Sequence, residues 1–231
     1  MNEHPMSTSR TLSTPARAGG LAMPDSSRKV LRNTYGLLGL TLAFSAAVAG
    51  TAMALKLPHP GLILTLVGFF GLMFLVNKTA HSAKGLLSVF ALTGFMGYTL
   101  GPLLSAVLTL PHGSAVITNA LGATALAFVG LSAVALTSKR DFSFMGGMLT
   151  IGMLVAFALS LGAIFFEIPA LSLAVSGLVV MLMSGMILVE TSRIVHGGET
   201  NYILATTGLY LSLYNLFTAL LSLFGMGGGD E

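Results

Sequence analysis

Cysteine is absent from this chain of 231 residues, and charged side chains make up only 8% of it. Without cysteine, the chain cannot form disulfides, thiolate zinc sites, cysteine-ligated iron–sulfur clusters or a cysteine nucleophile. A soluble domain carries about 25% charged residues, so the composition argues strongly against a free-standing globular enzyme. With 54% hydrophobic residues, the chain is not intrinsically disordered either. An integral membrane protein with one membrane domain remains.

Recognisable enzyme motifs are also missing. The chain has no zinc-protease, nucleophile-elbow, P-loop or dinucleotide-binding signature, so we expect neither an enzyme nor a cofactor. Its positive charges are scattered singly between apolar segments and form no basic face for nucleic acid. The histidines lie in the N-terminal tail or near predicted loops on both membrane sides, so a metal site is not expected. They are His4, His59, His81, His112 and His196.

Long apolar stretches fill most of the chain after residue 34. A membrane-spanning helix needs about 20 residues, and seven stretches have roughly this length. Strands of a membrane β-barrel would be about 10 residues of alternating polarity, so helices are predicted. The predicted spans are 34–55, 61–76, 85–108, 115–137, 144–166, 170–190 and 202–224. The predicted fold class is therefore an all-α membrane protein, a seven-helix transmembrane bundle.

The two ends of the chain differ from this bundle. Residues 1–27 are rich in Ser, Thr and Pro and contain no apolar run, which predicts a disordered tail and not a secretory signal. A plain solvated leader is the alternative interpretation. Residues 28–225 form the predicted seven-helix domain, and residues 226–231 form a short acidic C-terminal tail.

Lys and Arg residues are distributed unequally between the two sides of the predicted bundle. If the N-terminus is cytoplasmic, all of them except Lys56 fall in cytoplasmic segments. This is the bias that the positive-inside rule describes, so we expect a cytoplasmic N-terminus. Seven spans then place the C-terminus in the periplasm, whereas a re-entrant seventh segment would return it to the cytoplasm.

Glycines follow one face of the third predicted span. They are Gly94, Gly97 and Gly101, and the last two form a GxxxG pair. Small residues let helix backbones approach closely in lipid. We expect these glycines to pack helices together within the bundle, with a homo-oligomer interface as the alternative.

Glu190 is the acidic residue that falls at the edge of a predicted span, where it closes the sixth. A charge at the bilayer centre costs at least about 2.5–3.5 kcal/mol on insertion scales, so one interpretation is a gating or proton-sensing carboxylate. The other is an interfacial residue paired with Arg193, three positions along the same helix. The depth of Glu190 decides between them.

The seventh segment is the least uniformly apolar of the spans. Tyr210 and Tyr214 are four residues apart and share a helix face, and Asn215 neighbours that face. Such a segment is expected to lie among other helices or to line a wet cavity. Before it, Gly197 with Gly198 can end the sixth helix, and Thr200 or Asn201 can cap the start of the seventh.

The region around these two segments resembles a known family. Residues 188–203 and 209–217 are similar to the signature joining the last two helices of the Bax inhibitor-1 family. Further similarity, to bacterial inner-membrane members, lies in residues 29–35, 60–68, 94–95 and 101–102. The resemblance runs from about residue 28 to residue 225. It implies a seven-helix bundle of the Bax inhibitor-1 type, with the last helix central and wrapped by the other six.

The resemblance implies two different activities. The broad family is described as a pH-sensitive calcium leak controlled by an acidic pair on the last two helices. Glu190 matches the first acid, but the second falls at Ser212, and a serine can neither share a proton with Glu190 nor repel it. The leak mechanism is therefore in doubt for this chain, with calcium or protons as its candidate ions. The candidate gating or ion site comprises Glu190, Ser212, Arg193, Tyr210, Tyr214 and Asn215.

The bacterial inner-membrane members imply the leading hypothesis, a partner, substrate and modulator of the membrane-anchored AAA protease FtsH. Fully extended, residues 1–27 would reach about 90 Å at ~3.3 Å each, enough to enter a protease pore from the cytoplasmic side. FtsH would engage this tail, work slowly on the packed helices and be kept from other membrane substrates. A cation leak is the alternative, followed by a small-solute transporter.

Overall fold

The computed structural model describes residues 24–227, and seven helices in this range are long and apolar enough to cross a membrane. They are α1 (Asp25–Ala54), α2 (Leu62–Thr79), α3 (Lys84–Leu108), α4 (Gly113–Thr137), α5 (Gly146–Phe165), α6 (Pro169–Val195) and α7 (Tyr202–Gly227). A short 3-10 helix, η1 (Ser143–Met145), leads into α5. The predicted all-α seven-helix bundle is confirmed.

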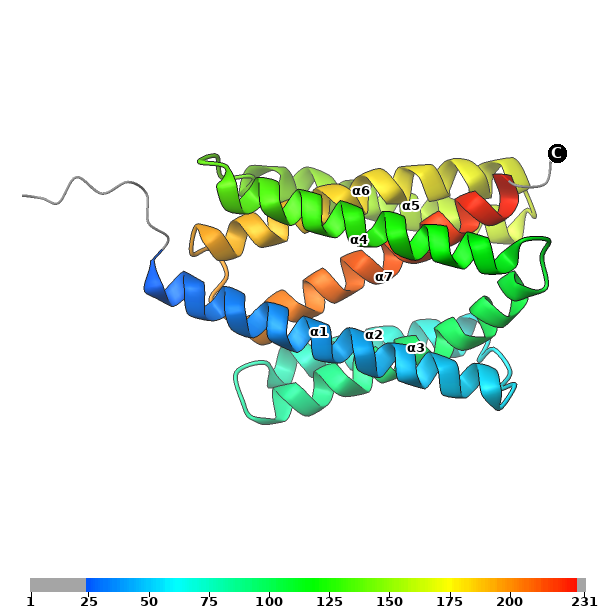
Figure 1. Ribbon diagram of the computed structural model, residues 1–231, viewed down its shortest axis with the longest axis horizontal. Coiled ribbons are helices and arrows are strands. Elements are labelled where there is room, and N and C mark those ends of the chain that lie inside the picture. The colour runs from blue at the N-terminus through cyan, green and yellow to red at the C-terminus, as the bar shows by residue number, and fades with distance from the viewer. Residues whose placement is uncertain (1–23, 228–231) are drawn as a thin grey trace, which may run out of the picture.

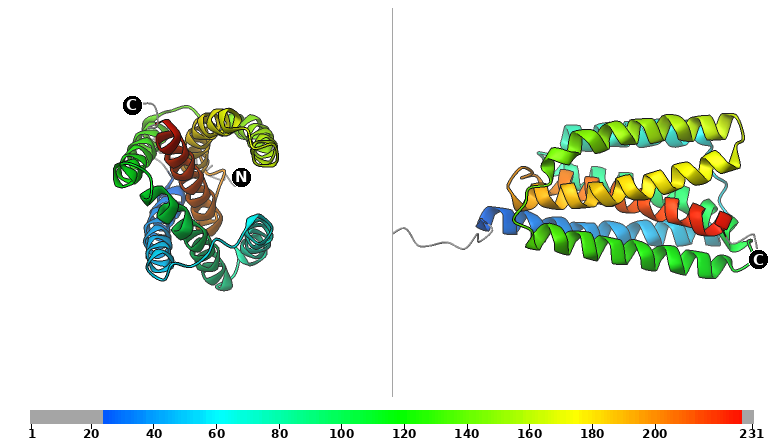
Figure 2. Two further views of the ribbon diagram at one scale, coloured as in Figure 1. Left: turned by 90° about the vertical axis from the view of Figure 1, so that its right-hand side faces the viewer. Right: turned by 90° about the horizontal axis from the view of Figure 1, so that it is seen from above.

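Helix α7 is the central helix of the bundle. Figure 1 shows it crossing obliquely between α1, α2 and α3 on one side and α4, α5 and α6 on the other, and Figure 2 shows the same arrangement from the end and from above. It packs against α1, α3, α4 and α6, while α2 lies against α3 and α5 lies against α6. The expected central position of the last helix is confirmed, with four of the six other helices as its close neighbours.

Helix α1 begins nine residues before the predicted span. Pro24 occupies the N-cap position, and Asp25 places a negative charge in the first turn, where the helix dipole favours it. Residues 25–27 are therefore helical, which corrects the boundary of the predicted tail, and residues 1–23 lie outside the described residues. With 30 residues, α1 is about 45 Å long, longer than a hydrocarbon core of about 30 Å, so its polar first turns extend beyond the apolar region.

Helix α6 continues five residues past Glu190, so Glu190 does not close the sixth helix as predicted. The three residues after Glu190 are polar, but polarity alone does not break a helix. The helix ends where Gly197 adopts φ +77° and the N–H of Glu199 donates to the Arg193 carbonyl at 3.1 Å. The expected glycine cap at Gly197 thus lies about two turns beyond the carboxylate.

Helix α7 starts at the expected asparagine cap. The Asn201 side-chain oxygen accepts the N–H groups of Ile203 at 2.9 Å and Leu204 at 3.4 Å. The helix runs to Gly227, two residues beyond the predicted domain boundary at 225. Residues 228–231, the rest of the predicted acidic tail, lie outside the described residues.

Basic side chains of the described range gather at one end of the bundle, which we call the basic end. It comprises the start of α1 and the loops 80–83, 138–142 and 196–201, at the left of Figure 1. The Lys and Arg residues at or near it are Arg28, Lys29, Arg32, Lys78, Lys84, Lys139, Arg140 and Arg193. Among the described residues, Lys56 is the one such side chain at the opposite end.

The glycine face of α3 packs closely against α1. A Cβ at Gly97 would clash with the backbone carbonyl oxygen of Ser45, and one at Gly101 would lie 2.6 Å from the Cβ of Ala52. A Cβ at Gly94 would lie 2.9 Å from a phenylalanine ring of α1. Small residues permit this approach in lipid. The face is occupied by a helix of the same chain, which supports packing within the bundle over an interface between copies.

Candidate functional site

Glu190 reaches across from α6 to α7. The Ser212 hydroxyl donates a hydrogen bond to its Oε2 atom at 3.2 Å. Gly208, one turn before Ser212, makes room for the carboxylate, because a Cβ there would lie 2.5 Å from Oε1. Glu190 is half-buried, about 7 Å of helix from the end of α6. The structure therefore brings together the two positions that the family pattern pairs.

Gly208 is a site residue that the sequence reasoning missed. It is four residues before Ser212 on α7, so the two form a small-xxx-small pair of the kind that lets helices approach in membranes. That spacing is the signal that could have identified it. Its lack of a side chain decides where the Glu190 carboxylate can lie.

Arg193 does not pair with Glu190. The Arg193 side chain is exposed, and the ion pairs within residues 24–227 are Asp25–Arg28 at 3.9 Å and Asp141–His196 at 4.0 Å. The interpretation of Glu190 as an interfacial acid paired with Arg193 is therefore not supported. In the same range, no three His, Asp or Glu side chains are placed to hold a metal ion.

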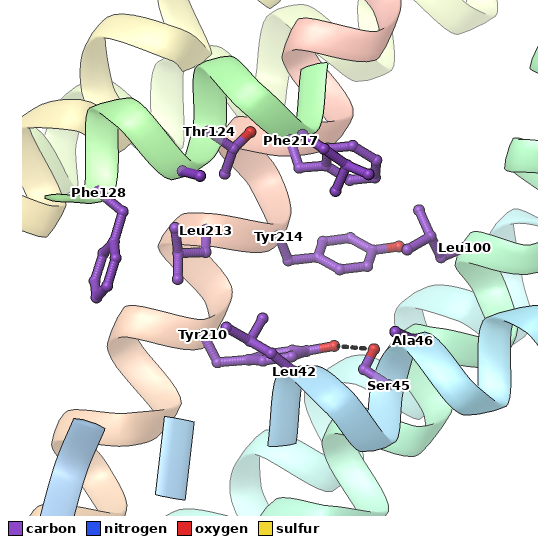
Figure 3. Close-up of a pocket in the computed structure, with 12 residues that line it drawn as sticks. Leu42, Ser45, Ala46, Leu100, Thr124, Phe128, Tyr210, Leu213, Tyr214 and Phe217 are labelled. Carbon is purple, nitrogen blue, oxygen red and sulfur yellow. Dashed lines mark hydrogen bonds between the residues drawn. The ribbon is translucent and has the colours of Figure 1, made fainter. Parts of the chain in front are cut away.

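Tyr210 and Tyr214 connect α7 to the first half of the bundle. Figure 3 shows both side chains extending from α7 toward α1 and α3. The Tyr210 hydroxyl is 2.7 Å from the Ser45 hydroxyl of α1, and the Tyr214 hydroxyl is 3.0 Å from the Thr99 hydroxyl of α3. These bonds satisfy polar groups that burial would otherwise leave unpaired. The tyrosines therefore fix α7 in place, and their hydroxyls bond to α1 and α3 and not to Glu190.

Asn215 faces a crevice that has a volume of about 360 Å³ and lies between α2, α3, α5, α6 and α7. Its amide nitrogen donates to the Leu211 carbonyl of the same helix at 2.8 Å. The other polar residues that line the crevice are Thr65, Thr99, Ser160 and Tyr214. The candidate residues of α7 therefore lie in different surroundings: Ser212 contacts Glu190, Tyr210 is bonded to α1, and Asn215 lines this crevice.

A second polar cluster, absent from the sequence predictions, lies at the basic end. Asp141 Oδ1 accepts the N–H of Ser143 at 2.9 Å and the hydroxyl of Ser192 at 3.2 Å, and the Phe142 N–H donates to Ser192 Oγ at 2.9 Å. His196 Nδ1 lies 4.0 Å from Asp141 Oδ1. The hydrogen bonds from Ser143 lower the pKa of the Asp141 carboxyl below its ordinary value. This cluster ties the loop before α5 to the end of α6.

Removing the Asp141 carboxylate should destabilise the protein in a pH-dependent way. A lowered folded-state pKa contributes stability above the unfolded pKa of about 3.9 and loses it as the pH falls through the folded value. We expect Asp141→Ala to melt a few degrees below the wild type at pH 7 and pH 5. The two melting midpoints should converge below about pH 4. A difference that persists unchanged at pH 3 would contradict this account.

Gly208→Ala should cost about 1 kcal/mol of stability, because the Glu190 carboxylate must leave its place beside Ser212. Adding Glu190→Ala should remove most of this cost, since the clashing group is gone. Glu190→Gln keeps the bulk and should not relieve it. A double-mutant cycle of unfolding free energies should give a coupling of about 0.5–2 kcal/mol for the alanine pair. Strictly additive costs would show that residues 190 and 208 do not touch.

Comparison with known proteins agrees with this arrangement. Residues 27–229 match the family model described as inhibitor of apoptosis-promoting Bax1. The chain belongs to the Bax inhibitor-1 family. Escherichia coli YccA, named modulator of FtsH protease, is 55% identical over 205 residues, covering 89% of this chain and 93% of YccA. YccA of a second Escherichia coli strain, equally similar, is named inner membrane protein. The resemblance stated from the sequence is confirmed.

Two other relatives of the Bax inhibitor-1 chain described here carry less specific names. An uncharacterized protein of Pseudomonas aeruginosa is 55% identical over 202 residues, covering 87% of this chain and 91% of its own. An uncharacterized membrane protein of Vibrio cholerae is 43% identical over 216 residues, covering 93% and 97%. None of these names describes an enzyme. Since the family match begins at residue 27, residues 1–26 lie outside it.

Proposed function

We propose that the protein is an inner-membrane modulator and substrate of an FtsH-type protease, acting in membrane-protein quality control. The observation that carries this proposal is the 55% identity to YccA, a named modulator of FtsH protease, over 89% of the chain. The aligned region includes nearly the whole seven-helix bundle. Any surface of the bundle that recognises the protease therefore rests on the same scaffold in both proteins.

The distribution of charge supports an orientation with the N-terminus in the cytoplasm and the C-terminus in the periplasm. The basic end carries the described Lys and Arg residues except Lys56, and cytoplasmic loops are enriched in these residues. In this orientation the chain that precedes α1 is on the same side as the pore of the protease. The 24 residues before Asp25 would reach about 80 Å if fully extended.

The packing of the bundle supports slow processing by the protease. α7 lies in the middle of the bundle and is held to α1 by the Tyr210–Ser45 bond and to α3 by the Tyr214–Thr99 bond. Extracting α1 from the membrane therefore requires breaking its close contact with α3 and its bond to α7. A protease engaged on residues 1–24 would be retained at this obstacle and withheld from other substrates.

Deleting residues 2–20 should abolish most of the association with the protease and slow turnover of the protein. The matched control keeps the length and composition of the tail but scrambles the order of residues 2–20. It should behave like the wild type if the protease recognises the length and composition of the tail and not a specific motif. The measurements are co-purification with FtsH and the half-life of each variant in cells. If the deletion leaves both the association and the half-life unchanged, FtsH does not engage the protein through this tail.

A cation leak is the second candidate function. It is favoured by the position of Glu190, which is half-buried between α6 and α7 with a hydroxyl as its partner. The crevice at Asn215 supplies polar groups farther along α7. Ion flux through reconstituted protein that depends on Glu190 would support this candidate, whereas tail-dependent protease association would support the first.

A further inference from the structure

A cleft of about 370 Å³ lies between α1 and α4, with α7 as its floor. It shares Tyr214 with the crevice at Asn215 but is otherwise lined by different residues. Figure 3 shows side chains of α4 and side chains of α1 on opposite sides of it, with side chains of α7 between them. Its floor is formed by Tyr210, Leu213, Tyr214 and Phe217, and its rim by Leu42, Ala46, Leu121 and Ala125.

The cleft opens sideways, on the surface that faces lipid. α1 and α4 both pack against α7 but do not pack closely against each other. At the rim, Leu42 is 37% exposed and Leu121 is 54% exposed, and the small side chains of Ala46 and Ala125 leave the entrance open. The rim is therefore continuous with the apolar outer surface of the bundle.

The depth of the cleft places it in the hydrocarbon region of the bilayer. Its lining residues lie near the middle of α4 and α7, and those of α1 lie near the middle of its apolar part. The α7 residues from Tyr210 to Phe217 cover about 10 Å of helix, within a hydrocarbon core of about 30 Å. At this depth the molecules that surround the entrance are lipid tails.

The polar groups of the lining are already satisfied. The hydroxyls of Tyr210 and Tyr214 are bonded to Ser45 and Thr99. The hydroxyl of Thr124 donates to a carbonyl of its own helix at 2.7 Å. An apolar cavity without free polar partners stays dry, and one of about 150 Å³ already holds benzene. The chemistry therefore selects an apolar occupant. The volume of about 370 Å³ is smaller than one turn of a helix that is about 10–12 Å across with a pitch of about 5.4 Å, so a whole helix does not fit.

We propose that this cleft binds one acyl chain of a bilayer phospholipid, which enters sideways between α1 and α4. The chain would fill space beside the middle of α7 and supply the dispersion contacts that an empty cleft lacks. Glu190 is not among the residues that line this site. Its occupancy is therefore measured without reference to ion flux or to the protease.

Tryptophan fluorescence gives a direct test, because the chain contains no tryptophan. Phe217→Trp places a reporter on the floor of the cleft, and Phe70→Trp places one on α2, where the side chain is 55% exposed on the outer surface. Each full-length variant is reconstituted in phosphatidylcholine whose acyl chains carry bromine near their middle. We expect quenching of the Phe217→Trp reporter to come within a factor of two of that of Phe70→Trp.

Filling the cleft provides the matched comparison. Ala125→Phe, at the rim, should lower the quenching of the Phe217→Trp reporter severalfold. Ala133→Phe, two turns along α4 and outside the cleft, should leave it unchanged. Ala46→Leu fills the cleft from α1 and replaces Ala125→Phe if that variant does not fold. The proposal would be overturned if quenching of the Phe217→Trp reporter is weak and neither Ala125→Phe nor Ala46→Leu changes it. So would quenching that falls as protein density rises, because a second copy would then occupy the cleft.

Discussion

Gly97→Ala should destabilise the bundle by about 2–3 kcal/mol, because the added methyl group meets backbone of the neighbouring helix. The new Cβ would meet the backbone carbonyl oxygen of Ser45 and would lie 3.0 Å from its Cα and Oγ atoms. A backbone cannot rotate away as a side chain can, so α1 and α3 must separate. Because the Ser45 hydroxyl is bonded to Tyr210, this separation also weakens the connection between α1 and α7.

Two controls separate the contributions to this effect. Gly71→Ala in α2 adds the same methyl group where nothing lies within 4 Å of the Cβ position, so its midpoint should match the wild type. Ser45→Ala removes the hydrogen bond to Tyr210 without a clash and should cost about 1–2 kcal/mol. Thermal unfolding of the purified variants in one detergent measures all three. Similar midpoints for Gly97→Ala and Gly71→Ala would contradict the close α1–α3 contact.

The fold follows from the sequence to a large extent because the bilayer imposes it. Seven apolar stretches of spanning length leave few alternatives to a helical bundle, and the polar residues of the last stretch indicate that it lies inside. The ends of the helices were less predictable. α1 starts in a polar segment that hydropathy does not assign to a span, and α6 extends past Glu190 because only Gly197 provides a stop signal.

A contact in the candidate site could be predicted only where each of the two residues is recognisable in the sequence by itself. Glu190 is conspicuous as a carboxylate in an apolar helix, and the family pattern indicates Ser212. Gly208 becomes important only because α6 and α7 bring it against that carboxylate. The contact between Asp141 and Ser192 joins residues 51 positions apart, so no local pattern in the sequence could indicate it.

Ser212→Asp should make ion flux through the reconstituted protein depend steeply on pH. The Ser212 hydroxyl lies 3.2 Å from Glu190 Oε2, so an aspartate here would place a second carboxylate within a few ångströms of the first. Two unit charges about 4 Å apart repel by roughly 4 kcal/mol at an effective dielectric constant of 20. At high pH this repulsion should push α6 and α7 apart, and at low pH a shared proton should hold them together.

The expected result is calcium flux that rises from pH 5 to pH 8 in dye-loaded liposomes containing Ser212→Asp, with a much smaller change for the wild type. Glu190→Gln combined with Ser212→Asp keeps one carboxylate and should lose the added pH dependence, because no repulsion remains. Glu190→Gln alone tests whether the wild-type carboxylate contributes to any basal flux. If all four proteins match empty liposomes at every pH, the carboxylate site does not control a leak. The protease-modulator function would then be the one that the bundle supports.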